Sequence, residues 1–418
     1  MFCRPGPNIY FWGGIGYNER LLKELLFAGG CFFLFLFYLL GEKIVLASKI
    51  KKIPLRICIT GTRGKSTVTR LIAGILRENG RKVLAKTTGS RPVMIFPDGS
   101  EKEIQRQGPP SIIEGKDVLK TADRLGVQAL VVEMMGIRPE TMRIESVRLF
   151  QPHILVITNA RLDHQEQMGT SKADIASSFA SAIPKHCSVF VPEKEYVPAY
   201  DTNVRRVNAK ILRVPEENNK IIEEKEGFET FLESDIRLTL SVAEFLDIDR
   251  KVALSGIKKS QRDIGSLKAW MSKDRALPKK CCFISAFAAN EPESTDLVLD
   301  YLKKKGIFEG KKRIALLCFR KDRGERTMQW IRALKKDFLS EFDRIFLLGE
   351  HAGVAFKKIS SASKGQDFVA RTSSSPEEIT SDAVFQDEDS VVVGMGNMVG
   401  LGRRLIKYWE TIGESCDL

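Results

Sequence analysis

The chain has 418 residues, of which 43% are hydrophobic and 28% charged, a composition that excludes a disordered or fibrous protein and allows two or three globular domains. The formal net charge of +13 favours acidic partners such as nucleic acid, an anionic membrane surface, nucleotide phosphates or a polyanionic product, although a solvated basic surface explains it equally well. The eight cysteines include no C-x-x-C pair and several lie in apolar runs, so we expect reduced core cysteines and a cytoplasmic setting.

The N-terminal segment, residues 1–50, contains an uncharged apolar run. Residues 25–40 read LLFAGGCFFLFLFYLL, which is close to the lower length limit for a helix that spans a bilayer. A signal peptide or a buried core helix are the alternatives, but no convincing cleavage site follows, and phenylalanines cover every face of the helix. Basic residues from Lys43 to Arg56 mark the cytoplasmic flank. We predict a single-pass anchor in the cell membrane over about 24–41, with the following domains in the cytoplasm.

A glycine turn joins the next two elements. The apolar run at 57–59 predicts a buried strand, and the apolar spacing over 68–76 predicts an amphipathic helix. Such a junction offers unpaired backbone N–H groups and the positive end of the helix dipole to a phosphate. The full P-loop pattern would need glycine at Ile59, so only G-x-x-G-K-S-T is present. We interpret it as an ATP-binding loop made of Gly61, Thr62, Arg63, Gly64, Lys65, Ser66 and Thr67.

The residue types within this loop suit different parts of a bound nucleotide and its metal ion. The two glycines let the backbone curl around phosphate oxygens, Lys65 adds a cation for the β- and γ-phosphates, and the Ser66 hydroxyl suits Mg²⁺. A strand over 81–86 follows, and then a region with four prolines that reads as loop and carries Arg91, Arg106 and Gln107 for substrate contacts. A helix is expected over 116–125.

Two further strands end on polar residues. The apolar run at 127–132 ends on Glu133, and the run at 154–158 leads into Asn159, Asp163 and His164. Ligands gather beyond the carboxyl ends of strands in open α/β sheets, so these side chains are candidates to surround a phosphate-bound metal ion. Glu133 is otherwise a surface carboxylate, and His164 by itself is more often structural.

A new alternation of strands and helices begins near residue 279. Strands are expected at 281–287, 314–318, 345–348 and 390–394, with helices near 294–304, 325–337 and 397–409. We therefore divide the chain into a central domain, 51–275, and a C-terminal α/β domain, 276–418. The second domain is expected to close over ATP and an amino substrate with polar residues near its strand ends, namely Asn290, Arg320, Asp322, Arg323 and Asn397. The glycines at 394–400 lack the following strand and acidic residue of a dinucleotide site.

These motifs, in this order, resemble those of the Mur-type ATP-dependent amide ligases and, among them, the poly-γ-glutamate synthase family. The resemblance covers about residues 50–410. It rests on TGTRGKST at 60–67, KTTG at 86–89, the strand ending in Glu133, TNxxxDH at 158–164, FAANE at 287–291, FRKDRGERT at 319–327 and GMGNMVG at 394–400.

The resemblance implies a Mur-ligase-like P-loop domain with a parallel sheet, followed by a Rossmann-like domain. It implies an ATP-dependent ligase that polymerises glutamate through γ-linkages by an acyl phosphate, with ATP and Mg²⁺ as cofactors. Its partners would be glutamate, the growing polymer, the membrane and small membrane subunits, and not nucleic acid. Ser66, Glu133 and His164 would hold the metal ion. The implied catalytic residues are Lys65, Glu133, His164, Asn290 and Arg323, and Asn159, Arg320 and Asp322 complete the nucleotide site.

Two positions depart from the family pattern. Many Mur ligases carry a modified lysine after the loop histidine, where this chain has Phe179 and Ala180, so a lysine-bridged second metal is not expected. The FAAND stretch of the family ends here on Glu291. A folylpolyglutamate-type or other amino-acid ligase, and a non-catalytic ATP-binding scaffold of a membrane complex, are the alternative functions.

Overall fold

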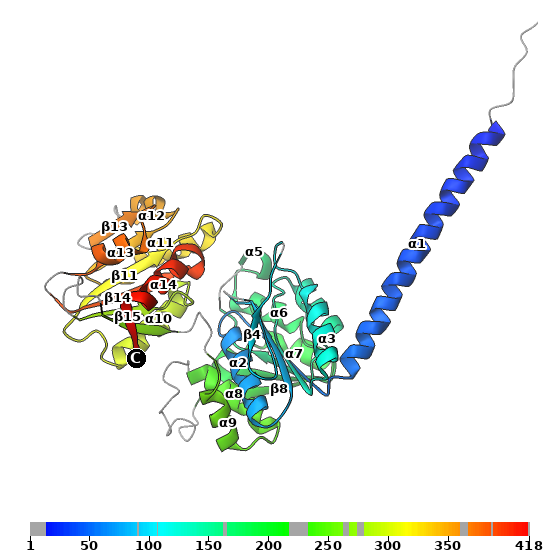
Figure 1. The fold of residues 1–418 in the computed structure, drawn as a ribbon, viewed down its shortest axis with the longest axis horizontal. Coiled ribbons are helices and arrows are strands. Elements are labelled where there is room, and N and C mark those ends of the chain that lie inside the picture. Colours follow the sequence, from blue (N-terminus) through cyan, green and yellow to red (C-terminus); the bar gives the residue numbers. More distant parts are fainter. Residues whose placement is uncertain are drawn as a thin grey trace, which may run out of the picture.

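The computed structural model describes residues 14–89, 92–106, 108–161, 165–216, 233–261, 267–273, 280–359, 367–385 and 388–416. Within these ranges the chain forms a long N-terminal helix followed by two α/β units, each built on its own sheet (Figure 1). Both units have helices on the two faces of a largely parallel sheet, which is the expected Mur-ligase-like α/β fold class.

The N-terminal helix α1, Gly14–Lys51, is longer than the expected anchor. Its segment Leu21–Lys51 is long and apolar enough to cross a membrane, and none of its most apolar window is buried within the protein. The last turn instead joins the protein core, because Ile50 is 2% exposed. Pro54 follows three residues after the helix end, where a proline disfavours further helix.

The first sheet has the strand order β4-β3-β2-β5-β1-β6-β7-β8, and only β3 and β4 run antiparallel to their neighbours. The central strand β1, Leu55–Thr60, lies between β5 and β6, so that Glu133 and Ile157 both sit at the end of β1 that leads into the glycine turn. The other strands are β2 Val83–Thr87, β3 Val93–Ile95, β4 Glu101–Glu103, β5 Ala129–Glu133, β6 Ile154–Ile157, β7 Ser188–Pro192 and β8 Lys210–Val214.

Helices cover both faces of this sheet and bury two apolar clusters against it. One face packs against α2 Lys65–Glu78, α8 Glu233–Phe245 and α9 Arg250–Lys258. The other packs against α3 Glu114–Leu125, α4 Pro139–Arg143, η1 Ile144–Phe150, α6 Lys172–Ala180, α7 Ala199–Arg206 and the end of α1. The short helices α5 Gln165–Met168 and η2 Glu193–Glu195 complete the unit.

The second sheet has the order β13-β12-β11-β14-β10-β9-β15, with β9 and β15 antiparallel at one edge. Its strands are β9 Lys268–Ser272, β10 Cys281–Ser285, β11 Lys312–Cys318, β12 Arg344–Leu348, β13 Asp367–Arg371, β14 Ser390–Gly396 and β15 Gly413–Cys416. The covering helices are α10 Pro292–Lys304, α11 Gly324–Leu334 and α12 Ala352–Ile359 on one face, and α13 Pro376–Ala383, η4 Met398–Gly402 and α14 Arg403–Ile412 on the other.

Two expectations need correction. The proline-containing region after residue 91 is not all loop, because β3 and β4 form a short antiparallel hairpin that extends the edge of the first sheet. The second sheet begins before residue 276, because β9 pairs with β10. Antiparallel edge strands as short as these lack the long apolar runs that revealed the central strands.

Candidate active site

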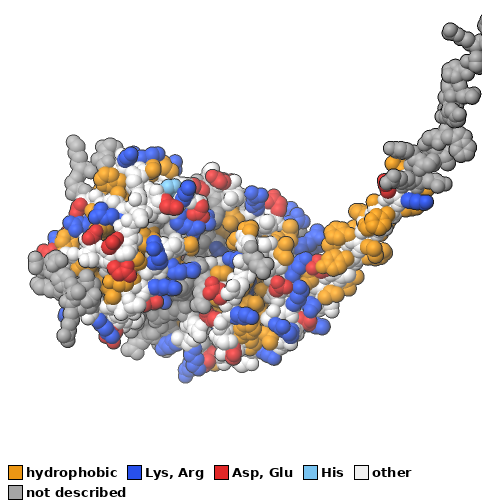
Figure 2. All heavy atoms as spheres, turned by 45° about the horizontal axis from the view of Figure 1, so that its top comes forward, with side chains coloured by type: hydrophobic (Ala, Val, Ile, Leu, Met, Phe, Trp, Pro, Cys, Tyr) orange, Lys and Arg blue, Asp and Glu red, His pale blue; other side chains and the backbone are white. Residues whose placement is uncertain are grey.

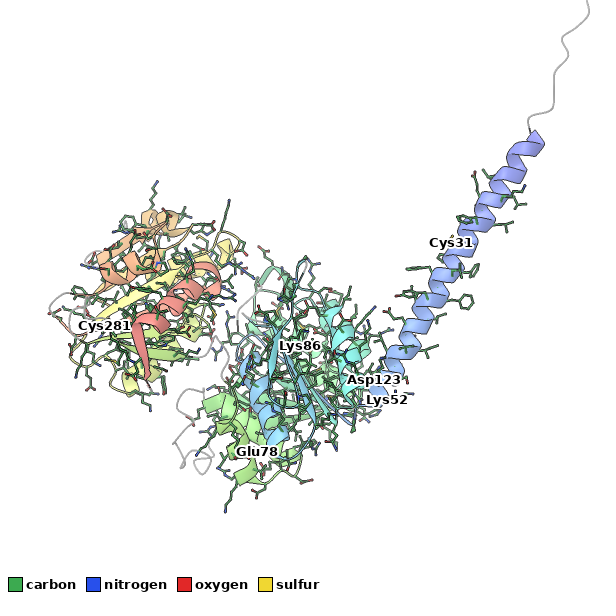
Figure 3. The ribbon with its side chains drawn as sticks, in the orientation of Figure 1. Cys31, Lys52, Glu78, Lys86, Asp123 and Cys281 are labelled. Carbon is green, nitrogen blue, oxygen red and sulfur yellow. The ribbon has the colours of Figure 1, made fainter. Side chains whose placement is uncertain are left out.

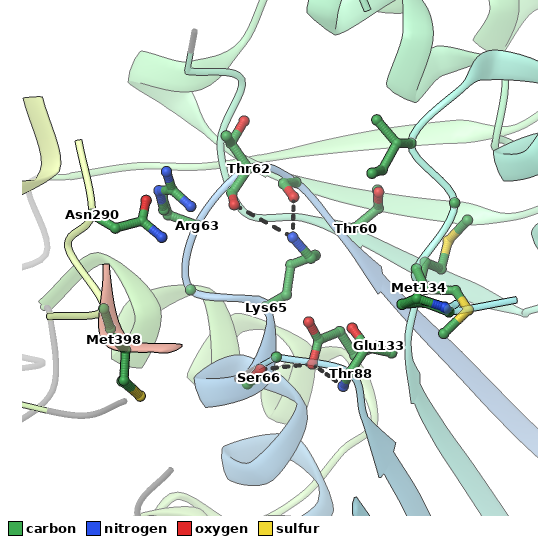
Figure 4. A pocket seen from close by; sticks show the side chains of 18 of the residues that line it. Thr60, Thr62, Arg63, Lys65, Ser66, Thr88, Glu133, Met134, Asn290 and Met398 are labelled. Atoms are coloured by element: carbon green, nitrogen blue, oxygen red, sulfur yellow. Dashed lines mark hydrogen bonds between the residues drawn. The ribbon is translucent and has the colours of Figure 1, made fainter. Parts of the chain in front are cut away.

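The glycine turn between β1 and α2 is shaped as a phosphate cradle. Gly61 and Gly64 have backbone φ angles of 127° and 78°, which favour glycine. Among the described residues no side chain caps the start of α2, so its first N–H groups point toward the loop. Lys65 Nζ folds back onto the carbonyl oxygens of Gly61 (2.7 Å) and Thr62 (3.4 Å) (Figure 4). The cation is thus held beside the cradle.

The strand end at β5 meets this loop. Glu133 is 2% exposed, and its Oε2 accepts hydrogen bonds from the Ser66 hydroxyl and from the Thr88 N–H, both at 2.7 Å (Figure 4). Ser66 and Glu133 therefore present two oxygen atoms at one point beside the cradle. Oxygen donors of this kind suit Mg²⁺. His164, the third expected metal ligand, lies outside the described residues, as does Asp163.

Asn159 supports the cradle from behind. Its Oδ1 accepts a hydrogen bond from the Arg63 N–H (3.0 Å), and its Nδ2 donates to the Arg63 carbonyl (3.1 Å). Thr158 Oγ1 donates to the same carbonyl at 2.5 Å. Asn159 is absent from the walls of the pocket described below, so within the described residues it shapes the loop instead of lining the nucleotide space.

The cradle opens into a cavity of about 420 Å³ that the two α/β units share. The first unit contributes the loop from Gly61 to Thr67 and Glu133, and the second contributes Asn290, Arg320 and Arg323. Figure 4 shows Asn290 and Met398 across the space from Lys65. The fold therefore brings together most of the candidate residues from sequence positions more than 200 apart.

Asp322 is the exception among the candidates of the second unit. It forms a bidentate ion pair with Arg320, in which Oδ1 lies 2.9 Å from Nε and Oδ2 lies 2.7 Å from Nη2. Asp322 does not line the cavity. Within the described chain Asp322 orients an arginine that does line it. A direct nucleotide contact by Asp322 stays a prediction.

Several lining residues were not singled out as site residues by their sequence. They include Thr88, Gly89, Pro110, Met134, Met135, Ile137, Met142, Met168, Phe179, Ala288, Arg326, Met398 and Val399. Phe179 is one of the residues that stand where many Mur ligases have the modified lysine, and it contributes to an apolar wall with the methionines. Thr88 belongs to the KTTG motif, which was the available signal for its role. Methionines reach this wall from four segments, and no spacing rule connects them.

A buried charge cluster stabilises the apolar side of the cavity. Glu145 accepts hydrogen bonds from the N–H groups of Met135 (3.0 Å) and Gly136 (2.8 Å), which line the cavity. Burial raises the pKa of Glu145 and lowers the pKa of Lys86, and each charge opposes the shift of the other. Lys86 Nζ also lies 3.9 Å from Glu114, which binds Arg106 at 2.7 Å. This cluster links the strand ends to Arg106 at the pocket rim.

Two arginines of the first unit reach the start of α10 in the second. Arg63 Nε lies 3.4 Å from Glu291 Oε1, and Arg161 Nη1 donates to Ser294 Oγ at 3.0 Å. The Arg161 N–H also donates to Thr62 Oγ1 at 3.1 Å. Glu291 is therefore a contact between the units as well as the cap of its own helix.

The comparisons agree with this architecture. The family described as the Mur ligase middle domain matches residues 59–256, and the family of the poly-gamma-glutamate synthase CapB C-terminal domain matches residues 274–412. The folylpolyglutamate synthase/dihydrofolate synthase of Yersinia pestis, solved with AMPPNP and a Mn ion, has a TM-score of 0.64 at 14% identity, over 88% of this chain and 93% of the other. That likeness shows the fold.

Two curated relatives align over most of the chain. The capsule biosynthesis protein CapB of Bacillus anthracis is 30% identical over 397 residues, 93% of this chain and 83% of the relative. The PGA synthase CapB of Bacillus subtilis strain 168 is 32% identical over 368 residues, 86% of this chain and 91% of the relative.

The phosphate cradle, the second α/β unit and the middle-domain match define an ATP-dependent amide ligase of the Mur type. Within that class, the chain belongs to the poly-γ-glutamate synthase CapB family.

Proposed function

We propose that this ligase joins glutamate units through their γ-carboxyl groups at the cytoplasmic face of a membrane, with ATP and Mg²⁺. The observation that carries the proposal is the shared cavity, in which a phosphate cradle on one unit faces Asn290, Arg320 and Arg323 on the other. The glutamate polymer is taken from the names of the relatives, a poly-gamma-glutamate synthase family and a PGA synthase.

The cradle favours transfer of the γ-phosphate to a carboxylate. The N–H groups at the start of α2 and the Lys65 ammonium stabilise the negative charge of the phosphates. A substrate carboxylate oxygen attacks the γ-phosphorus, ADP leaves, and an acyl phosphate remains. The amine of the next substrate then attacks the acyl carbon, the amide C–N bond forms, phosphate leaves, and the amine loses one proton.

The residues present fit a magnesium ion beside the γ-phosphate. Ser66 and Glu133 supply two oxygen donors whose atoms lie 2.7 Å apart, and the Thr88 N–H orients the carboxylate. A bound Mg²⁺ would supply charge neutralisation of the phosphate oxygens. His164 remains the proposed third ligand. Asn290 and Arg323 are proposed to contact the reacting groups from the second unit, and Arg320, oriented by Asp322, to hold the nucleotide.

The membrane location rests on α1. The exposed apolar segment of this helix is long enough to span a bilayer, and basic residues follow it. The net charge of +13 would also attract a polyanionic product. Small membrane subunits that carry the polymer outward are a further part of the proposal.

The decisive experiment compares ATP hydrolysis and polymer formation by the wild type and by Lys65→Ala in membranes that contain the chain and its proposed subunits. We expect ADP release that depends on glutamate, γ-linked polymer in the same sample, and loss of both in Lys65→Ala. Hydroxylamine added during turnover should trap the acyl phosphate as a hydroxamate. Lys304→Ala, on the exposed side of α10, is the matched control and should behave as wild type.

Different failures have different meanings. ATP turnover without a glutamate requirement would contradict the proposed substrate and favour another amino-acid ligase. Nucleotide binding without turnover under every substrate condition would contradict catalysis and favour a scaffold.

A further inference from the structure

The C-terminal part of α1, from Glu42 onward, and Lys52 directly after it are held to the central unit by several contacts. Glu42 accepts a hydrogen bond from Lys116 Nζ at 2.7 Å, and Lys49 and Lys52 both donate to Asp123, at 2.9 Å and 3.2 Å. Figure 3 shows Lys52 and Asp123 together at the base of the helix, far from Cys31. Ile50 is buried in the core just beyond these pairs. The helix and the domain therefore form one unit.

These pairs also give the direction of α1. Position 42 of α1 meets position 116 of α3, and position 49 meets position 123, so the two helices run side by side in the same direction. Toward its N-terminus α1 therefore leaves the domain at the end where α3 begins. Figure 2 shows the projecting part of α1 covered by hydrophobic side chains, in contrast to the mixed surface of the two α/β units.

The apolar surface begins where the contacts with the domain stop. Leu40 is 52% exposed, whereas Glu42 already pairs with α3. Two residues of helix correspond to about 3 Å. If α1 spans a bilayer, the edge of the domain at the start of α3 must therefore lie against the headgroup layer, because no linker separates the two.

The loop at this edge has an unusual composition for a surface loop. Residues 108–113 read GPPSII, without a charge, and Gly108, Pro109, Pro110 and Ile113 are exposed. Ile113, at the start of α3, is 64% exposed. Lys43 is exposed on α1, and the exposed Lys120 of α3 forms an ion pair with Asp117 at 3.2 Å. A single exposed isoleucine is ordinary, but this one lies in an uncharged apolar loop at the place where the apolar helix emerges.

We propose that the loop at residues 108–113 is a second membrane contact, which inserts Pro109 and Ile113 at the boundary between headgroups and acyl chains. Exposed apolar side chains with a lysine such as Lys43 nearby are typical of surfaces that lie in this layer. The inference rests on the membrane anchor of the proposed function and adds the orientation of the catalytic unit.

This orientation has a consequence for catalysis. Arg106 and Pro110 both line the ATP cavity, and Arg106 is tied through Glu114 to the first turn of α3. The loop therefore connects one rim of the cavity to the bilayer surface. The polymer end is extended next to the membrane, where a membrane-embedded acceptor of a polyanionic chain can receive it.

The test places one extra tryptophan in the loop. The full chain carrying Ile113→Trp is reconstituted in vesicles of phosphatidylethanolamine and phosphatidylglycerol, with and without a lipid that carries a nitroxide quencher near the headgroup. The matched control is Phe245→Trp, because Phe245 is also exposed but ends α8, the helix that starts beside the phosphate cradle, and so lies at the opposite edge of the same sheet. Pro109→Trp is the second probe in case the first variant does not fold.

The proposal predicts that the added fluorescence at 113 is shifted to shorter wavelength and quenched severalfold more than at 245. Equal quenching at both positions in chains that float with the vesicles would overturn the proposal and leave the anchor intact, and would favour a protein partner on this loop. Failure of the chain to float would overturn both the anchor and this contact, whereas glutamate ligation in detergent would still test the chemistry separately.

Discussion

Two helices begin on opposite sides of the cavity, and their first turns have different partners. The helix α2 starts at Gly64 in a left-handed conformation, with no acidic residue in its first turn. The helix α10 starts at Glu291, whose carboxylate accepts hydrogen bonds from the N–H groups of Glu293 (3.1 Å) and Ser294 (3.2 Å). Both ends carry the same positive dipole. Among the described residues the start of α2 has no side-chain cap, whereas the start of α10 is capped by the carboxylate of Glu291.

Glu291 has two roles at this helix end. Its carboxylate serves as the helix cap and as the acceptor for Arg63 of the phosphate cradle. Because Arg161 reaches Ser294 in the same turn, the capped end of α10 is the point where the second unit contacts the candidate ATP-binding loop. The capped start of α10 thus helps to position the loop at the start of α2, where we propose that the phosphates bind.

The largest effect is expected at Gly64, at the uncapped start of α2. Gly64→Ala would strain a φ of 78° and place its Cβ 2.8 Å from Asp235 Oδ1. The left-handed strain costs an alanine about 1–2 kcal/mol, so the loop of the free variant leaves this conformation and must regain it to bind a phosphate. We therefore expect ATP affinity to fall by about tenfold, measured by calorimetry. Gly324→Ala, at the start of α11 with open space around it, is the matched control. Equal affinities in the two variants would contradict the cradle.

A smaller effect is expected at Glu291, which caps the start of α10. Glu291→Ala removes the cap of α10 and the contact to Arg63, and loss of a cap costs about 1–2 kcal/mol of unfolding free energy. Denaturant unfolding measures the loss, and Glu291→Asp should recover most of it because a shorter carboxylate still caps. A Glu291→Ala variant as stable as the wild type would contradict the role of this carboxylate as a helix cap.

The docking contact itself should contribute less. A double-mutant cycle of Arg161→Ala and Ser294→Ala is expected to give a coupling of about 0.5–1 kcal/mol, since the pair joins a charged donor to a hydroxyl at 3.0 Å. The Michaelis constant for ATP should rise in Arg161→Ala through the lost hydrogen bond to α10. Additive effects of the two substitutions would show that the contact does not couple the units.

The smallest expected effect on ATP affinity concerns the titration of Asp235 beside the start of α2. Burial raises the pKa of Asp235 to about 7, against the nearby charge of Arg161. The folded chain therefore holds a proton that the unfolded chain releases near its ordinary pKa of 3.8, so the stability contributed by the proton is present at acid pH and declines up to about pH 7.

Asp235→Asn tests this titration. The variant should lack the decline in unfolding free energy, and its ATP affinity should not weaken above pH 7, where the wild-type carboxylate beside Gly64 becomes charged and repels phosphate. A few-fold difference in affinity at alkaline pH is expected. Parallel pH profiles of the two proteins would refute a role for this proton.

The sequence was most informative where local patterns are strong. The apolar runs and the glycine spacing predicted β1, α2, β5 and β6 to within a few residues, because strands buried on both faces need continuous apolar side chains. The order of motifs also indicated the ligase class and the family. The strands β3, β4 and β15 were missed, because segments of three or four residues are too short to show such a pattern.

The sequence by itself determined the phosphate cradle, because its conformation depends on residues adjacent in the chain: two glycines, a lysine, a serine and the start of a helix. Only the tertiary structure decided what surrounds that cradle. Asn159 hydrogen-bonds the backbone of the loop and stabilises its shape, and Arg161 and Glu291 connect the two units. Methionines from separate segments form one wall of the cavity. These contacts depend on how distant elements pack, and no local spacing encodes them.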